Sequence, residues 1–257
     1  VKLRAEDIHP SVSTEEANGR INQGLPVIDP GKLKLSEAAL AALLQKICSI
    51  LAGHAAAGYS IGERLEEAGR LGKVNLGELA EKAISDDEEY LGQVSETTGE
   101  DKEETIFLAT ALAAPFLRIC AQLLSRKVDL DSMQSQWCPI CGGTPLMAKL
   151  RQGDGKRILE CSLCNTQWAS RRLQCLFCGN EDQDSLGFFF TEEEGVYRVD
   201  KCDRCKRYIK TVDERKEAEG ESRLLLLEDV ATIYLDMLAE KEGYQSITKA
   251  LWKEGNH

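Results

Sequence analysis

The sequence predicts an α+β protein with an N-terminal helical domain, two tandem four-cysteine modules of the zinc-ribbon type, and a C-terminal helix. Four Cys-x-x-Cys pairs fall within residues 138–205. Short apolar runs around glycine-containing turns lie between the pairs and predict β-hairpins. The segments on either side carry apolar residues at helical spacing. This change in composition marks a domain boundary.

Residues 1–130 form the predicted helical domain. Three of the six prolines lie in residues 1–35 and indicate an extended or irregular arm. Apolar residues at every third or fourth position predict a helix over 37–57, with Ser36 as its N-cap. Glycines divide residues 60–95 into two or three short amphipathic helices.

A longer apolar stretch predicts the central helix of this domain over residues 101–126. The stretch begins with carboxylates, which stabilise a helix N-terminus. Pro115 lies in its middle and cannot donate a backbone hydrogen bond, so we expect a kink or an interruption there. Another amphipathic pattern, over 223–242, predicts a single helix within the C-terminal segment 216–257.

The cysteine region is an internal repeat of two modules, residues 137–172 and 173–215. Nineteen residues separate the two cysteine pairs of the first copy and 23 separate those of the second, but only ten lie between the copies. This spacing favours two sequential metal sites over an interleaved cross-brace. The predicted ligands are Cys138, Cys141, Cys161 and Cys164 in the first site, and Cys175, Cys178, Cys202 and Cys205 in the second.

Four thiolates complete a tetrahedral site that suits either zinc or iron. Zinc that only holds a small β module together is the alternative to iron that exchanges electrons. A closed site offers no coordination position to a substrate or a water molecule, so metal-based catalysis is not expected. Cys48 and Cys120 lie on apolar helical faces, where thiols act as small hydrophobic side chains. The chain is therefore predicted not to be an enzyme.

The residue after each second cysteine is expected to adopt a left-handed backbone conformation. Glycine and asparagine tolerate this conformation, and Gly142, Asn165 and Gly179 fit it. Lys206 does not fit, so the fourth turn is expected to differ from the other three.

Charge and hydropathy narrow the classes of function. The net charge of −11 argues against general binding to nucleic acids, which requires a basic surface. No run of eighteen or more apolar residues occurs, so no membrane span is predicted. The first residues lack the basic-then-apolar order of a secretory signal, and the expected location is the cytoplasm, where thiols stay reduced.

The order of the cysteine motifs resembles the formate dehydrogenase accessory protein FdhE family. The resemblance lies in Trp137-Cys-Pro-Ile-Cys-Gly-Gly-Thr-Pro, Cys161-Ser-Leu-Cys-Asn-Thr-Gln-Trp, Cys175-Leu-Phe-Cys and Cys202-Asp-Arg-Cys. It implies a helical N-terminal domain joined to two rubredoxin-like modules with two iron ions, zinc being the alternative. It also implies a cytoplasmic, non-enzymatic role in maturation, with the formate dehydrogenase catalytic subunit as the partner before export.

Within the resembling stretch, Trp168, Arg171 and Arg172 are the candidate partner-binding residues. Simple solvation of the two arginines is the competing interpretation. Two other functions remain open from the sequence: a rubredoxin-like electron carrier, and a zinc-ribbon nucleic-acid-binding protein, which the acidic flanks disfavour.

Overall fold

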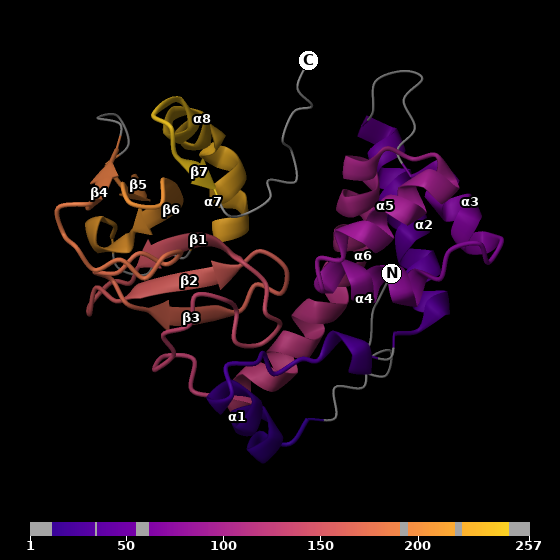
Figure 1. The fold of residues 1–257 in the computed structure, drawn as a ribbon, viewed down its shortest axis with the longest axis horizontal. Coiled ribbons are helices and arrows are strands. Elements are labelled where there is room, and N and C mark those ends of the chain that lie inside the picture. The colour runs from indigo at the N-terminus through magenta and orange to yellow at the C-terminus, as the bar shows by residue number, and fades with distance from the viewer. Residues whose placement is uncertain (1–11, 34, 55–61, 191–194, 219–222, 247–257) are drawn as a thin grey trace. The chain divides into compact units, whose positions relative to one another are not determined.

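The computed structural model describes residues 12–33, 35–54, 62–190, 195–218 and 223–246. The chain divides into a helical unit, Val1–Lys127, and a unit built around a β-sheet, Val128–His257 (Figure 1). Each unit has its own buried core.

The helical unit contains six described α-helices. They are α1 (Thr14–Asn22), α2 (Glu37–His54), α3 (Glu63–Arg70), α4 (Leu76–Ile84), α5 (Glu88–Thr98) and α6 (Lys102–Leu124), with the short 3-10 turns η2 (Pro30–Lys32) and η3 (Ser125–Lys127). The short helices expected over 60–95 correspond to α3, α4 and α5. The expected end of the helix over 37–57 lies outside the described residues.

Helix α6 is the centre of the helical unit. The carboxylate of Asp101 caps it by accepting from the backbone N–H groups of Glu103 and Glu104 at 2.8 and 3.3 Å. Helices α2, α4 and α5 pack against α6, and eleven of its residues are buried. The helix continues through Pro115. The interruption considered for Pro115 is therefore absent, because burial of Phe116 and Leu117 in the following turn offsets the lost backbone hydrogen bond.

The segment Lys102–Lys127 is also long and apolar enough to cross a membrane, with a mean hydropathy of 1.7 in its most apolar window. Half of that window is buried within the protein. A helix at the centre of a folded domain has the same length and composition, so the segment by itself does not establish a membrane span.

The extended or irregular arm expected over residues 1–35 is wrong for residues 14–22, because α1 is helical. Ser13 caps this helix by accepting from the backbone N–H of Glu16 at 3.1 Å. Arg20 then donates to the carbonyl oxygen of Pro26 at 2.7 Å and lies 3.5 Å from Asp29. These contacts fix a short helix and a turn where proline content alone indicated irregular chain. Residues 1–11 lie outside the described residues.

The second unit is built on one seven-stranded sheet that includes both cysteine modules. Its strands are β1 (Pro145–Leu150), β2 (Arg157–Cys161), β3 (Gln167–Ser170), β4 (Leu186–Phe189), β5 (Tyr197–Cys202), β6 (Arg207–Asp213) and β7 (Gln245–Ser246). The order is β3-β2-β1-β6-β5-β4, with β7 paired to β6. The two expected hairpins are present as β1–β2 and β4–β5.

The two modules join through a parallel pairing of β1 with β6. Ala148 lies opposite Thr211, and Leu150 lies opposite Asp213. Within each copy the three strands are antiparallel neighbours. Since the first strand of one copy pairs with the last strand of the other, the modules form a continuous sheet.

The single C-terminal helix expected over 223–242 is wrong, because two helices occupy this range. They are α7 (Leu225–Ala231) and α8 (Ile233–Lys241), separated at Thr232. The ammonium group of Lys210, on β6, is buried and lies 2.9 Å from the carboxylate of Asp229 and 2.6 Å from that of Asp236. This buried cation ties both helices to the sheet, and the break at Thr232 allows both carboxylates to reach it.

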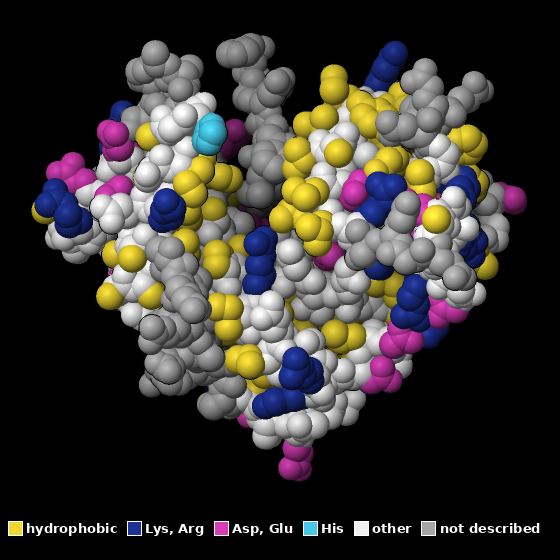
Figure 2. Space-filling model, turned by 180° about the vertical axis from the view of Figure 1, so that it is seen from behind, with side chains coloured by type: hydrophobic (Ala, Val, Ile, Leu, Met, Phe, Trp, Pro, Cys, Tyr) yellow, Lys and Arg dark blue, Asp and Glu magenta, His cyan; other side chains and the backbone are white. Residues whose placement is uncertain are grey.

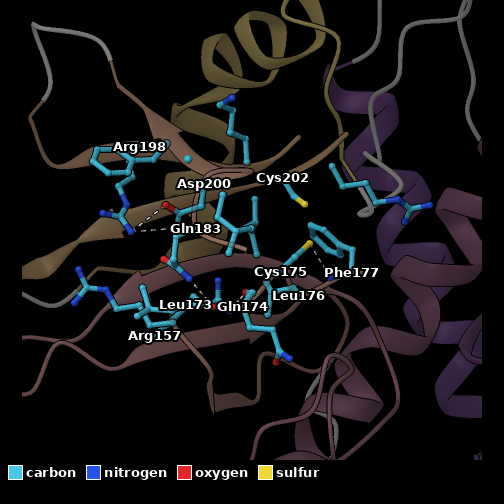
Figure 3. Close-up of a pocket in the computed structure, with 17 residues that line it drawn as sticks. Arg157, Leu173, Gln174, Cys175, Leu176, Phe177, Gln183, Arg198, Asp200 and Cys202 are labelled. Atoms are coloured by element: carbon cyan, nitrogen blue, oxygen red, sulfur yellow. Dashed lines mark hydrogen bonds and ion pairs between the residues drawn. The ribbon is translucent and has the colours of Figure 1, made fainter. Parts of the chain in front are cut away.

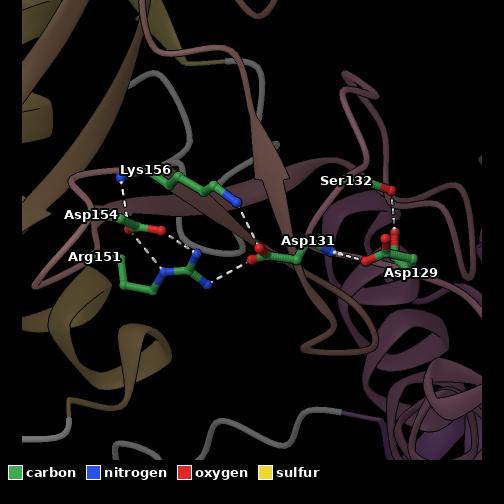
Figure 4. A network of polar contacts seen from close by, with 6 residues as sticks. All are labelled: Asp129, Asp131, Ser132, Arg151, Asp154 and Lys156. Carbon is green, nitrogen blue, oxygen red and sulfur yellow. Dashed lines mark hydrogen bonds and ion pairs between the residues drawn. The ribbon is translucent and has the colours of Figure 1, made fainter.

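The polar segment that precedes the first cysteine is fastened to the sheet. Asp131 accepts from Arg151 at 2.6 Å and from Lys156 at 2.7 Å, and Arg151 also holds Asp154 (Figure 4). The hydrogen bonds from Arg151 and Lys156 lower the pKa of Asp131 to about 2. The backbone N–H of Ala169 on β3 also donates to the carbonyl oxygen of Leu130 at 2.9 Å.

Substitution of Gly62 by alanine is expected to destabilise the helical unit by about 1–3 kcal/mol. Gly62 has a φ of +84°, and an added Cβ would lie 2.8 Å from the sulfur of Cys48 and 3.0 Å from Leu108. Urea unfolding measures the change.

Gly92→Ala is the matched control, since Gly92 lies inside α5 with open space around it. Alanine there is expected to stabilise by about 0.5–1 kcal/mol through helix propensity. Equal effects of the two substitutions would contradict the close approach at Gly62.

Candidate metal centres

The structure brings the four cysteines of the first predicted site together, and we name this group the first centre. It consists of Cys138, Cys141, Cys161 and Cys164, whose sulfur atoms all lie within 4.8 Å of one another. Two of the sulfur–sulfur distances, Cys138–Cys164 and Cys141–Cys161, are 3.5 Å. Four sulfurs at 2.3 Å from a tetrahedral ion would be separated by about 3.8 Å. The spacing therefore fits one ion with four thiolate ligands.

The four cysteines of the second copy form the second centre. It consists of Cys175, Cys178, Cys202 and Cys205, also within 4.8 Å of one another. The sulfurs of Cys175 and Cys205 are 3.6 Å apart, and those of Cys178 and Cys202 are 3.8 Å apart. In each centre, one pair comes from the turn before a hairpin and the other from the turn after it. The grouping is sequential rather than interleaved.

All four cysteine turns share one backbone conformation. Gly142, Asn165, Gly179 and Lys206 have φ values of 80°, 57°, 68° and 55°. Each donates its N–H to the carbonyl of the first cysteine of its turn at 2.8–3.2 Å. The expectation that the fourth turn differs is therefore wrong. Lys206 accepts the conformation while its ammonium group lies 3.4 Å from Asp203 and over the ring of Tyr244.

The two centres differ in their exposure to solvent. All four cysteines of the first centre are buried. In the second centre Cys178 is exposed and Cys205 is half-buried. The structure thus encloses the first centre and leaves one side of the second open to solvent.

Hydrogen bonds to the sulfurs oppose the effect of burial, which raises the pKa of Cys175 to about 12. Leu163 and Phe177 donate backbone N–H groups to the sulfurs of Cys161 and Cys175, each at 3.4 Å. Hydrogen bonds from neighbouring thiols lower the pKa of Cys164, whereas burial raises the pKa of Cys161. Four buried sulfurs without a cation cannot all ionise together, and a bound metal ion supplies the missing positive charge.

The donor set suits zinc or iron equally, since both accept four thiolates in a tetrahedron. With all four positions taken by protein, a bound ion holds the turns together or exchanges an electron, and it offers no site to a substrate. Cys48 is buried in the helical unit, where burial raises the pKa of its thiol to about 11. Cys120 is buried in α6.

The candidate partner-binding residues lie in different environments. Trp168 is 1% exposed, and its indole N–H donates to the carbonyl oxygen of Ser135 at 2.9 Å. The Trp168 side chain is thus buried within the sheet-containing unit, and its contact with a partner stays a prediction. Arg171 is exposed and lies 3.2 Å from Glu181, and Arg172 is also exposed.

Sequence reasoning missed polar residues that surround the second centre. Asn180 is buried, and its amide donates to the sulfur of Cys202 at 3.8 Å and to Ser185 at 2.6 Å. Arg157 is buried and donates to the carbonyl oxygens of Arg171 and Gln174 in the chain between the modules. Burial lowers the pKa of Arg157 to about 10. No spacing rule marks these residues, since their partners lie in loops or on another strand whose position the sequence pattern does not give.

Comparison with known families identifies both parts of the cysteine region. Residues 137–172 match the profile "FdhE, central domain" and residues 173–251 match "FdhE, C-terminal domain". Each profile covers one of the two centres, and the second also covers α7 and α8.

Similar proteins carry the same name. The chain is 32% identical over 126 residues to a protein FdhE homolog of Aquifex aeolicus, covering 48% of this chain and 44% of that protein. It is 28% identical over 176 residues to a homolog of Haemophilus influenzae, covering 68% and 55%. It is 33% identical over 114 residues to protein FdhE of Escherichia coli O1:K1 / APEC, covering 43% and 35%. The matched segments thus span about half or less of these relatives.

The fold is similar to that of a solved structure. The crystal structure of the FdhE protein from Pseudomonas aeruginosa matches with a TM-score of 0.61 at 22% identity, over 97% of this chain and 82% of that one. At this identity the comparison supports the fold.

Lys206→Gly is expected to give a more stable protein than Lys206→Ala by about 1 kcal/mol. Both variants lose the contacts of the lysine side chain, but only glycine relieves the φ of +55°. The free energy of unfolding in urea, measured at a fixed metal content, tests the order. The control position is Arg204, which is exposed and has no positive φ. There, Arg204→Ala should be more stable than Arg204→Gly. The same order at both positions would refute a strained backbone at Lys206.

Protein loaded with two zinc ions is expected to release them to a chromogenic chelator in two phases. The faster ion should come from the second centre, because Cys178 is exposed whereas every ligand of the first centre is buried. The measurement is chelator absorbance against time. Cys178→Ser should remove the fast phase and leave the slow one. If the fast phase persists in Cys178→Ser, the faster ion does not come from the second centre and the prediction is wrong.

Proposed function

The chain belongs to the FdhE family through residues 137–251, and we propose that it is an accessory protein for the maturation of formate dehydrogenase. In this role it binds the immature catalytic subunit in the cytoplasm before assembly or export. The observation that carries the proposal is the match of both FdhE domains to the segments that gather the two cysteine centres.

The closed geometry of the centres supports a role without catalysis. Each centre uses four thiolates, so a bound ion has no free position at which to activate a substrate. We infer that the ions are iron, with zinc as the alternative, and that they shape a docking surface. The open side of the second centre, at Cys178, supports sensitivity to redox conditions there rather than at the first centre.

An exposed row of apolar side chains supports binding to another protein. We name it the apolar row, and it consists of Leu224, Leu227, Val230, Ile233 and Met237, which are 45–69% exposed. These residues recur every three or four positions from Leu224, the N-cap of α7, to Met237 in α8, within the matched C-terminal domain. Leu225 and Leu235 on the same helices are buried against the sheet. Figure 2 shows exposed apolar side chains gathered in several groups on one face of the molecule. Solvent-exposed apolar residues in such a row are typical of a protein-binding surface.

A rubredoxin-like electron carrier is the second candidate. The exposure of Cys178 favours it, since electron transfer needs a centre near the surface. Reversible bleaching of an iron–thiolate absorption band, with electron delivery to an acceptor, would favour this role. A colourless zinc protein would exclude it.

We expect the full chain to co-purify, under anaerobic conditions, with the catalytic subunit of formate dehydrogenase from the same organism. Leu227→Glu combined with Met237→Glu should reduce the recovered subunit at least about tenfold, because the charges disrupt apolar contact. Ile50→Glu is the matched control, since Ile50 is 50% exposed on α2 and lies outside the apolar row. The measurement is the amount of subunit recovered for each molecule of bait.

Folding and metal content of each variant are checked by circular dichroism and metal analysis. Failure of the unmodified chain to retain the subunit would overturn the proposed function. Equal losses for the control and the double variant would remove the apolar row as the contact surface.

A further inference from the structure

A small pocket lies beside the second centre, entirely within the sheet-containing unit. Its volume is about 210 Å³, and Cys175 and Cys202 form part of its wall. Figure 3 shows Arg157 and Arg198 on one side of the pocket, with Asp200 close to Arg198. This volume is below the range of about 300–1,000 Å³ typical of drug-sized ligands. The pocket thus fits a small polar group.

The lining carries an excess of positive charge, and we name it the basic pocket. Its cationic residues are Arg157, Arg172, Arg198, Lys201 and Arg207, and Asp200 is the acidic residue that lines it. Asp200 lies 2.9 Å from Arg198, and Lys201 lies 2.9 Å from Asp203. Among the residues that the structure describes, the other three arginines form no ion pair within 4.0 Å. Positive charge therefore remains to be balanced.

Two buried donors in the lining also lack acceptors. The Nε atoms of Arg157 and Arg198 are buried and have no hydrogen-bond partner in the described part of the chain. Arg157 is 5% exposed and is held by Ser170 at 3.4 Å and by the carbonyl oxygen of Gln174 at 2.8 Å. Phe188 lies under the guanidinium of Arg198 at 4.7 Å. Leaving a buried N–H without an acceptor costs free energy, so these two arginines are held in place at a cost.

The negative charge of the second centre's thiolates explains only part of the arrangement of these arginines. Four thiolates around a divalent ion carry two negative charges, which attract nearby cations over several ångströms. That attraction places arginines near the centre but gives their Nε donors no hydrogen bond. An anion inside the pocket supplies the negative charge that the lining arginines lack.

We propose that the basic pocket binds a small oxyanion, with phosphate, free or as part of a larger ligand, as the first candidate. Guanidinium groups match the oxygen atoms of phosphate and carboxylate through paired hydrogen bonds. A tetrahedral oxyanion fits the volume and offers oxygens to several arginines at once. Because the pocket contacts Cys175 and Cys202, the bound anion lies next to the second centre. The inference is independent of the identity of the protein partner.

The test titrates inorganic phosphate into the full, metal-loaded chain at constant ionic strength, using calorimetry and the thermal midpoint. Binding and a rise in midpoint are expected for phosphate, with no such response to chloride. Arg172→Gln and Arg207→Gln should each weaken phosphate binding about tenfold, since each removes a charged hydrogen-bond donor. These two residues are exposed or half-buried, so the variants are expected to fold. Arg157 is avoided because it also fastens the chain between the modules.

Arg171→Gln is the matched control, since Arg171 is a neighbouring exposed arginine that does not line the pocket. It should bind phosphate like the unmodified chain. If acetate competes with phosphate, the pocket is still an oxyanion site, and it also accepts carboxylates. No response beyond chloride, or an equal loss in Arg171→Gln, would overturn the proposal. A third result would also contradict the proposal. If Arg172→Gln and Arg207→Gln lose metal and the unmodified chain does not respond to phosphate, the arginines serve only to balance the charge of the thiolates.

Discussion

The convergence of four cysteine sulfurs from two tight turns is the constraint on which each module depends. A three-stranded ribbon has little apolar area to bury, and the ion that its sulfurs can hold supplies the missing stabilisation. The turns must adopt a left-handed residue after the second cysteine to direct both sulfurs inward, and all four do so. Once the turns are fixed, the hairpins between them are set in register, and the β1–β6 pairing joins the modules into one sheet.

The cysteine spacing predicted the two groups of sulfurs and the hairpins between them because these features are local. The central helix α6 was also predictable, since its apolar pattern is long and its cap lies beside it in sequence. Features that depend on distant residues were not predictable. Lys210 on β6 binds Asp229 and Asp236 from the two C-terminal helices, and Ser135 accepts from the buried Trp168. The φ of Lys206 shows that the geometry of the turn overrides the preference of a single residue.

The two copies have the same turn geometry, but their centres lie in different environments. All four ligands of the first centre are buried, and Asp131 fastens the preceding segment to the first hairpin. The second centre has Cys178 at the surface and a basic pocket beside Cys175. The apolar row on α7 and α8 belongs to this same C-terminal part of the chain.

Strand β1 is synthesised well before β6, the strand with which it pairs. All ligands of the first centre have been made once Cys164 has emerged, whereas the sheet partner of β1 begins at Arg207. The first module can therefore acquire its ion while one edge of β1 is still uncovered. The edge is covered only when β6 of the second module pairs with β1, so the folding of the second copy governs how long an unpaired strand is exposed to aggregation.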